Sequence, residues 1–270
     1  MSKYDEVVNA FTSHTPQVMG ILNVTPDSFH DGCRAMTDAD ILGRVDAIVA
    51  EGAHIVDIGA CSTRPGAVPP SVQEERQRLR HALTLISGHR RDLTLSVDTF
   101  RADVARMCVE EYGVQIVNDV SGGEADEAMF ATVASLRATY VLTFGKAAGM
   151  AGFFAEKLER LHGLGCDRVI LDPGLGFGKT LDECYQAVAM IPSLQCFGWP
   201  ILVGASRKSM IYKILDATPR DALNGTTVLN TLALMQGASI LRVHDVREAV
   251  EAIRIVRKYQ ENNQTIWVSE

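Results

Sequence analysis

Short apolar runs, rich in β-branched residues, recur eight times along the chain and are separated by polar segments. The runs begin at Val18, Ala53, Leu93, Gln115, Thr139, Arg168, Pro200 and Ser239. Continuous apolar runs of this kind are typical of strands in a parallel sheet that is covered on both faces.

Helical patterns lie between these runs. Apolar side chains recur every three or four positions in three segments: Ile41, Val45, Ile48 and Val49; Leu79, Leu83 and Ile86; and Val246, Val250 and Ile253. Such spacing places them on one face of a helix. Capping-box patterns mark helix starts at Ser71 and Thr180, each followed by Glu three residues later, and Asp245 with Glu248 is a looser version.

Strands that alternate with helices in a chain of 270 residues predict a (β/α)8 TIM barrel, formed as a single domain over residues 1–270. The alternative is a doubly wound sheet that binds a dinucleotide. Its glycine-rich turn would follow the first strand, where this chain has NVTPDSF and no G-x-G-x-x-G.

A glycine-rich stretch, DPGLGFGKT from Asp172 to Thr180, ends like a phosphate-binding loop but has the wrong spacing. A Walker A loop requires Gly, four residues and then Gly-Lys-Ser/Thr. The position that needs the first glycine holds Pro173, and Gly174 is one residue too close. We therefore predict that Thr180 is a helix N-cap and that Lys179 is an ordinary loop lysine.

Composition narrows the functional classes. Apolar residues make up 47% of the chain, and the formal net charge is −7. This negative charge argues against a protein that binds nucleic acid or acidic membrane surfaces in general. Six cysteines without a C-x-x-C pair, a polar start without a secretory signal, and the lack of a long apolar run predict a cytoplasmic protein with free thiols.

Polar residues gather where the expected strands end, which is where barrel enzymes carry their active sites. These residues are Asn23, Asp57, Asp98, Asn118, Asp119, Asp172, Ser206, Arg242 and His244, with Lys208 shortly after the seventh run. Any one of them is more often a solvated loop residue or a helix cap. The collection is more informative, because its chemistry divides into two groups.

The first group, Asp98, Asn118 and Asp172, can accept hydrogen bonds from the amino and ring N–H groups of a flat heterocycle. The second group contains basic and polar residues, namely Asn23, Arg64, Arg242 and His244. Arginine forks bind phosphate oxygens in pairs. The residues alone therefore indicate a heterocycle at the centre of the site and a phosphorylated arm at one side.

Seven stretches of the chain resemble the dihydropteroate synthases, a family of pterin-binding barrels. In chain order they are MGILNVTPDSF from Met19, STRPGA from Ser62, SVDT from Ser96, NDVSG from Asn118, DPGLGFGKT from Asp172, LVGASRKS from Leu202 and RVHDV from Arg242. The resemblance implies a transferase of folate synthesis. It would join 6-hydroxymethyl-7,8-dihydropterin diphosphate to 4-aminobenzoate, release pyrophosphate and use Mg²⁺.

The resemblance also implies a role for each matching residue. The expected pterin ligands are Asp98, Asn118, Asp172 and Lys208. The expected diphosphate ligands are Asn23, Arg64, Arg242 and His244, and Asn23 is also the expected metal ligand. The residues expected to border the aminobenzoate are Phe29, Thr63, Pro65, Phe177 and Ser206, and Asp27 and Phe29 lie on a first loop that closes over the site.

The implied mechanism lets pyrophosphate depart ahead of the attack. An electron-rich dihydropterin can carry positive charge on its methylene carbon, so that carbon needs a nearby carboxylate and the leaving group needs cations. The expected catalytic residues are Asp98, Lys208 and Arg242. The aminobenzoate nitrogen is neutral near pH 7 and needs no strong base.

The chain departs from the family pattern at four places. Cys61 stands where Glu is usual, and Cys184 stands where Asn is common; both are expected to act in packing. The fifth run ends in Leu142, Thr143 and Phe144 where Met-His-Met is usual, so either Phe144 replaces the usual methionine by stacking on the pterin or the site is weakened. The connection that follows is shorter than usual.

Two alternatives remain open at this stage. One is a methyltransferase of the same superfamily that passes a methyl group from a folate to a corrinoid protein, although it needs no diphosphate clamp. The other is a pterin-binding relative with little or no turnover. The resemblance further implies a homodimer and a target of sulfonamides, with small-molecule substrates as its other partners.

Overall fold

The computed structural model describes residues 15–25, 36–61, 68–146 and 148–266 of the chain. Its strands are β1 (Gln17–Asn23), β2 (Ile55–Gly59), β3 (Thr94–Asp98), β4 (Ile116–Asp119), β5 (Thr139–Thr143), β6 (Val169–Asp172), β7 (Leu202–Val203) and β8 (Ile240–Val243). Its α-helices are α2 (Asp38–Ala50), α3 (Val72–His89), α4 (Ala102–Tyr112), α5 (Met129–Leu136), α6 (Met150–Gly163), α7 (Leu181–Ala189), α8 (Ile191–Leu194), α9 (Ser209–Tyr212), α10 (Leu223–Met235) and α11 (Val246–Ile266). Two 3₁₀ turns, η1 (Gln195–Phe197) and η2 (Pro219–Asp221), complete the described elements.

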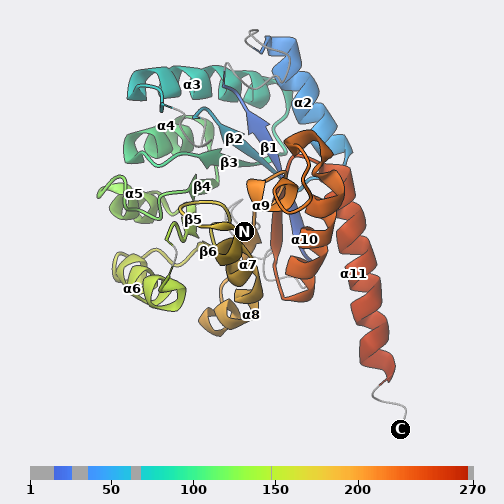
Figure 1. Cartoon of the computed structure of the whole chain (residues 1–270). Coiled ribbons are helices and arrows are strands. Elements are labelled where there is room, and N and C mark those ends of the chain that lie inside the picture. The colour runs from blue at the N-terminus through green and yellow to red at the C-terminus, as the bar shows by residue number, and fades with distance from the viewer. Residues whose placement is uncertain (1–14, 26–35, 62–67, 147, 267–270) are drawn as a thin grey trace.

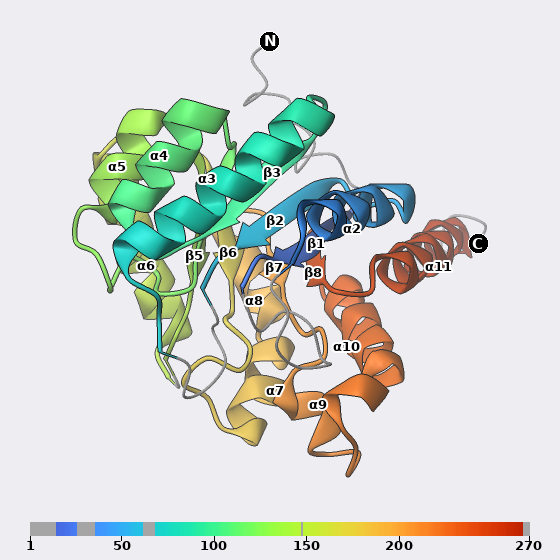
Figure 2. The ribbon, with the colours of Figure 1, turned by 90° about the horizontal axis from the view of Figure 1, so that it is seen from above.

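The strands are all parallel and form one sheet in the order β6-β5-β4-β3-β2-β1-β8-β7. The outer strands meet at a single bridge between Leu171 and Ile201, next to which the Leu171 N–H donates to the Pro200 carbonyl at 2.9 Å. This contact closes the sheet, and the helices surround the strands (Figures 1 and 2). The predicted (β/α)8 barrel is confirmed.

The helix caps confirm the predicted starts of α3 and α7. Thr180 accepts from the backbone N–H of Glu183 at 3.4 Å, while the Glu183 carboxylate accepts from the Thr180 N–H at 2.6 Å. Ser71 accepts from the Glu74 N–H at 3.2 Å. Each bond satisfies a backbone donor that the first helical turn leaves without a partner.

The predicted apolar stripes face the strands. Ile41, Val45 and Ile48 of α2 are buried against the sheet. Gly20 allows α2 to lie close to β1, because a Cβ at this position would lie 2.5 Å from Cγ2 of Ile48. Within the described ranges, no helix is both long enough and apolar enough to cross a membrane.

Lys179 has a structural role that the sequence did not predict. Its Nζ donates to the carbonyl oxygens of Phe144, Gly174 and Phe177 at 2.6, 3.0 and 3.3 Å. Gly174 has a φ of +67°, and a Cβ there would lie 2.1 Å from the Phe144 oxygen. The glycine-rich stretch therefore packs directly on the end of β5, and the lysine binds the two segments together.

The expectation that Phe144 stacks on the pterin is wrong. The Phe144 ring packs between the sheet and the helices, 5.2 Å from the ring centre of Phe153 and 6.2 Å from that of Phe154. Side chains alternate between the two faces of a strand. Thr143, which pairs with Asp172 of β6, therefore lies on the interior side at this end of β5.

We expect replacement of Lys179 by Met to destabilise the protein by about 1–3 kcal/mol, because buried carbonyls lose their donor. The control is Lys146→Met, since Lys146 is half exposed and pairs with Glu124 on the surface. This control should change the free energy of unfolding by less than about 0.5 kcal/mol. Urea unfolding measures both variants, and equal stabilities would contradict the structural role of Lys179.

Candidate active site

The barrel interior has an apolar floor. It consists of Met19, Ile55, Ile116, Val141, Ile170, Leu202 and Ile240, one residue from each of seven strands. Two residues further along, β2, β4, β6 and β8 carry Asp57, Asn118, Asp172 and Arg242. Because side chains alternate along a strand, these residues face the interior again, just above the floor.

Arg242 is held between two carboxylates. Its Nε donates to Oδ2 of Asp57 at 2.7 Å, and its Nη2 donates to Oδ2 of Asp98 at 2.7 Å. Asp57 is fully buried, and only 12% of the Asp98 side chain is exposed. Hydrogen bonds between charged groups are strong in such a setting. The Arg242 guanidinium, which comes from β8, is therefore held in a fixed orientation against the carboxylates of β2 and β3.

Burial and neighbouring charges shift the pKa values of both Asp98 and Arg242. Burial raises the pKa of Asp98 to about 7; Arg242 opposes this rise, while Asp57, Asp119 and Glu75 add to it. Burial alone would lower the pKa of Arg242, but Asp57 and Asp98 raise it above its ordinary value. Arg242 is therefore a permanent cation, and Asp98 changes its charge near neutral pH.

Asp57 is the member of this group for which the sequence analysis proposed no role. Besides Arg242, its Oδ2 accepts from Nδ2 of Asn118 at 3.1 Å. An aspartate inside an otherwise apolar run, two positions after an interior isoleucine, is the signal that identifies it.

Asp172 and Lys208 face each other across the seam between β6 and β7. Oδ1 of Asp172 accepts from the Gly174 N–H at 2.7 Å. Burial raises the pKa of Asp172 and lowers that of Lys208 to about 8, and each charge opposes the shift of the other. Nζ of Lys208 donates to the Leu175 carbonyl and lies 4.4 Å from the centre of the Phe177 ring.

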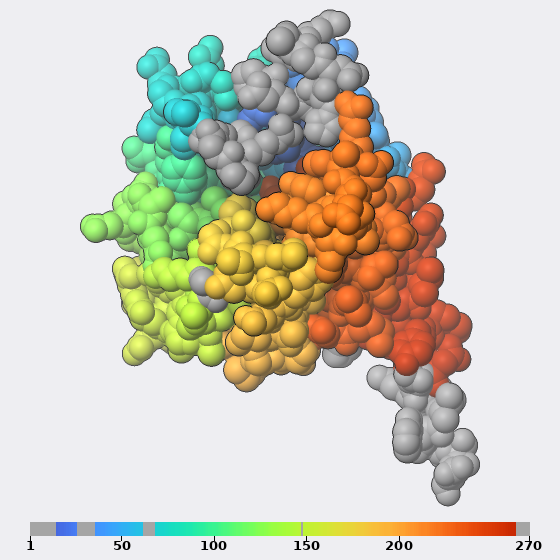
Figure 3. Space-filling model, in the orientation of Figure 1, coloured from blue at the N-terminus to red at the C-terminus, as the bar shows by residue number. Residues whose placement is uncertain are grey.

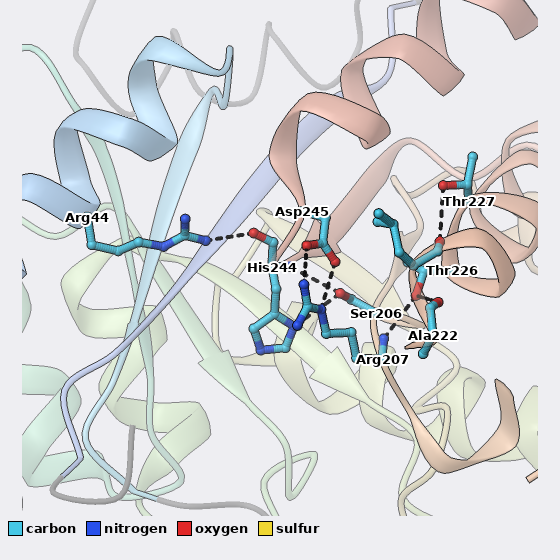
Figure 4. Close-up of polar contacts among 9 residues, drawn as sticks. Arg44, Ser206, Arg207, Ala222, Thr226, Thr227, His244 and Asp245 are labelled. Atoms are coloured by element: carbon cyan, nitrogen blue, oxygen red, sulfur yellow. Dashed lines mark hydrogen bonds and ion pairs between the residues drawn. The ribbon is translucent and has the colours of Figure 1, made fainter. Parts of the chain in front are cut away.

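His244 and Ser206 form a third group, from the ends of β8 and β7 (Figure 4). The Ser206 Oγ accepts from the backbone N–H of His244 at 3.1 Å and lies 3.0 Å from its Nδ1. Burial, with a further effect of Arg242, lowers the pKa of His244 to about 4. The ring is therefore neutral at pH 7. Either atom of the Ser206 Oγ–His244 Nδ1 pair can be the donor, and a Ser206 hydroxyl that donates to Nδ1 leaves the ring proton on Nε2.

Further contacts hold this end of the barrel (Figure 4). Arg207 donates to both carboxylate oxygens of Asp245, at 2.9 and 2.6 Å, and its backbone N–H donates to Oγ1 of Thr226 at 3.0 Å. Arg207 has a φ of +55°, which is uncommon for a residue with a side chain. From α2, Nη2 of Arg44 donates to the His244 carbonyl at 2.6 Å. These bonds fix the backbone on both sides of Ser206 and His244.

The structure therefore brings together most of the residues that the sequence predicted. Asp98, Asn118 and Arg242 meet around Asp57; Asp172, Lys208 and Phe177 form the second group; and Ser206 and His244 form the third. Asn23 ends β1, and its Oδ1 lies 3.2 Å from the position of a Cβ on Gly59, near Asp98. Five predicted residues lie outside the described residues: Asp27, Phe29, Thr63, Arg64 and Pro65.

Both cysteines at the departures from the family pattern are buried, as predicted. Burial and the neighbouring Glu75 raise the pKa of Cys61 to about 12, so its thiol stays protonated. Sγ of Cys184 accepts from the Gly176 N–H at 3.3 Å, which confirms a packing role.

A charged and polar layer above an apolar floor, at the carboxyl ends of the strands, is typical of a barrel enzyme. The sequence model of the family described as "Pterin binding enzyme" matches residues 19–244. The chain therefore belongs to the pterin-binding enzymes.

The relatives narrow this assignment. The chain is 38% identical over 257 residues to dihydropteroate synthase of Escherichia coli strain K12, covering 89% of this chain and 90% of the relative. It is also 38% identical over 264 residues to that of Mycobacterium leprae, covering 89% and 92%. Within the pterin-binding enzymes, it thus groups with the dihydropteroate synthases, the transferases that form dihydropteroate in folate synthesis.

Solved structures agree with this assignment. The chain matches Yersinia pestis dihydropteroate synthase in a sulfonamide drug complex with a TM-score of 0.83 and 36% identity, over 92% of this chain and 95% of that one. It matches the Xanthomonas albilineans enzyme with 4-aminobenzoic acid with a TM-score of 0.84 and 36% identity, over 91% and 93%. Of the functions that the sequence left open, these matches support the synthase.

The titration of Asp98 predicts how pterin binding depends on pH. A pKa of about 7 means that Asp98 is protonated below pH 7 and then loses acceptor capacity toward ligand N–H groups. We expect affinity for free 6-hydroxymethylpterin to fall about fivefold between pH 7 and pH 6, because the ionised fraction of a carboxyl with a pKa of about 7 falls from about one half to about one tenth. Calorimetry from pH 5.5 to 7.5 measures this change.

Asp98→Asn is the control for this measurement. The variant should bind the pterin more weakly and show no transition near pH 7, because the titrating group is gone. A flat profile in the unsubstituted protein would contradict the titration of Asp98, and a transition that persists in Asp98→Asn would assign it to another group.

Proposed function

We propose that the chain binds 6-hydroxymethyl-7,8-dihydropterin diphosphate in the polar layer of the barrel and transfers its pterin-methyl group to 4-aminobenzoate. The observation that carries this proposal is the Arg242 guanidinium, buried between Asp57 and Asp98 above an apolar floor. A flat heterocycle fits the floor, and an anionic arm fits the cation.

The pterin ring would contact Asp98, Asn118, Asp172 and Lys208. The three acidic or amide side chains supply hydrogen-bond acceptors for the amino and ring N–H groups. Lys208 supplies a donor for a ring carbonyl or nitrogen. Phe177, whose ring lies under the Lys208 ammonium, would extend the apolar wall toward the aminobenzoate.

The diphosphate would extend toward Arg242, His244 and Asn23, with Arg64 as a further ligand. Arg242 uses Nε and Nη2 for the two carboxylates, and we propose that Nη1 turns toward the diphosphate. His244 is neutral, so its Nε2–H would donate to a phosphate oxygen without adding charge. Ser206 would fix this tautomer by donating to Nδ1, in addition to its proposed position beside the aminobenzoate.

Mg²⁺ fits this end of the site as a partner of the diphosphate. Within the described residues, no cluster of three or more His, Cys, Asp or Glu side chains could hold a metal ion. The Asn23 oxygen near Asp98 suits an ion that takes most of its ligands from phosphate and water. The bound ion would supply positive charge to the departing pyrophosphate.

The remaining residues would complete the aminobenzoate pocket. We propose that Phe29, Thr63 and Pro65 join Phe177 and Ser206 around this substrate. The Yersinia pestis relative was solved with a sulfonamide drug, and we propose that such drugs occupy the same pocket in this chain.

In the reaction, the bond from the methylene carbon to the diphosphate oxygen would break ahead of attack by the aminobenzoate nitrogen. Ionised Asp98 would stabilise the positive charge that develops on the pterin and its methylene carbon. Arg242 would stabilise the departing anion. Lys208 would hold the pterin in line with the attacking amine, which loses its proton to solvent after the new bond forms.

We further propose that the protein acts in the cytoplasm as a homodimer. The described cysteines carry free thiols, which fits a reducing compartment. Packed side by side, α10 and α11 form one side of the molecule (Figures 1 and 3). Their large exposed apolar side chains are Val228, Leu232, Met235, Ile255 and Tyr259. A cluster of this kind favours contact with a second copy.

Turnover of the two substrates tests the proposed function. Dihydropterin diphosphate with 4-aminobenzoate should give dihydropteroate and pyrophosphate, and chelation of Mg²⁺ should abolish the product. Asp172→Asn should weaken pterin binding about tenfold to a hundredfold, because an amide cannot accept two N–H bonds as a carboxylate does. Folded protein that binds pterin but gives no product would support a pterin-binding protein without turnover.

The proposed homodimer predicts that a charged side chain introduced on the exposed face of α10 disrupts the contact between the two copies. Leu232→Arg should convert the dimer to a monomer in sedimentation velocity, because an arginine would be buried without a partner at the contact. Arg254→Leu, on an exposed part of α11, serves as the matched control and should leave the dimer intact. A monomeric parent protein would contradict the proposal.

A further inference from the structure

Asp57 is a fully buried charged residue at the end of the barrel that carries the candidate site. Its relative exposure is 0%, and both of its hydrogen bonds are made by Oδ2, one from Arg242 and one from Asn118. Among the described residues, Oδ1 has no hydrogen-bond partner. Asp57 therefore holds Asn118, which is proposed to touch the pterin, and Arg242, which is proposed to touch the diphosphate.

The contact with Asn118 determines how its amide is oriented. A carboxylate accepts hydrogen bonds and cannot donate them, so only the NH₂ end of the amide can face Asp57. The reversed amide would place two oxygens 3.1 Å apart in a buried setting. Such a repulsive contact is costly. The carbonyl oxygen of Asn118 is thereby directed away from Asp57.

We propose that Asp57 is a positioning residue that sets the hydrogen-bond polarity of the pterin site. It fixes Asn118 with its carbonyl oxygen toward the ligand. The site then favours a heterocycle that presents an amino group at that point and disfavours one that presents a carbonyl. This inference rests on the proposed binding of a pterin at this site.

The other groups of the site agree with this polarity. Asp98 and Asp172 supply carboxylate oxygens, so a carbonyl from Asn118 makes the third acceptor around the same region. An aminopyrimidine edge carries several N–H donors and needs such a set. An amide free to turn would suit either kind of edge and would discriminate less.

The ratio of affinities for two similar ligands, pterin and lumazine, tests the inference. Pterin carries an amino group at C2, and lumazine carries a carbonyl there on the same bicyclic ring. The parent protein should bind pterin more tightly than lumazine. In Asp57→Ala, residue 57 offers no acceptor, so Asn118 can turn its amide. The ratio of the two affinities should fall about tenfold.

Asp119→Ala is the matched control. Asp119 is a fully buried carboxylate on the same strand as Asn118, but it faces away from the barrel interior and accepts from Tyr140, Ser121 and Gly123. Its substitution should lower stability and leave the ratio of affinities unchanged. A residue with a merely structural role would behave in the same way.

A double variant provides a rescue. In Asp57→Ala with Asn118→Asp, the carboxylate at 118 accepts hydrogen bonds in either orientation. Position 118 is then an acceptor toward the ligand once more, and the preference for pterin should return. A ratio that stays low in the double variant would overturn the proposal, as would an unchanged ratio in Asp57→Ala.

Neutron diffraction of the unsubstituted protein tests the same point without a variant. Deuterons on the Asn118 nitrogen directed at Asp57 support the proposal, and the reverse orientation overturns it. A parent protein that binds neither pterin nor lumazine would instead contradict the proposed function.

Discussion

The site depends on one guanidinium that is shared by two buried carboxylates. Arg242 comes from β8, while Asp57 and Asp98 come from β2 and β3, so the ion pairs cross the barrel interior. Removing Arg242 would leave two buried carboxylates without their cation in a setting of low dielectric, which is strongly destabilising. The fold therefore has to place these strands accurately before the site exists. The apolar floor below them provides that placement.

Asp57 and Asp98 share the electrostatic effect of the Arg242 cation. If Arg242 paired with Asp98 alone, the pKa of Asp98 would lie lower; the charge of Asp57 instead helps to raise it toward neutrality. The arrangement keeps a carboxylate at the proposed pterin position, and the pKa of this carboxylate responds to nearby charge. At the other side of the proposed position, Asp172 and Lys208 each limit the pKa shift of the other. The two halves of the site therefore have different electrostatic characters.

Much of this could be predicted from the sequence. The apolar runs identified all eight strands of the barrel, and the capping pairs at Ser71 and Thr180 identified two helix starts, because these signals are local. The errors and omissions concern the direction of side chains and contacts between distant segments. Phe144 was expected to face the pterin, but direction depends on the phase of alternation along β5, which a short apolar run does not define. Lys179 binds Phe144, and Asp57 binds Asn118 and Arg242. An aspartate inside an apolar run marks Asp57 as a buried group, but no local pattern indicates partners that lie so far along the chain.

The weak closure of the barrel has a consequence for its energetics. Within the described residues, β6 and β7 are joined by one bridge, which is formed by Leu171 and Ile201. The other neighbouring strands pair at two to five positions. Asp172 lies at the end of β6, and Lys208 follows β7, so a pterin held by both would span this seam. Ligand binding would then act as a cross-link, and its free energy would add to the cohesion of the barrel where backbone hydrogen bonds are fewest. The enzyme would be most resistant to opening while its substrate is bound.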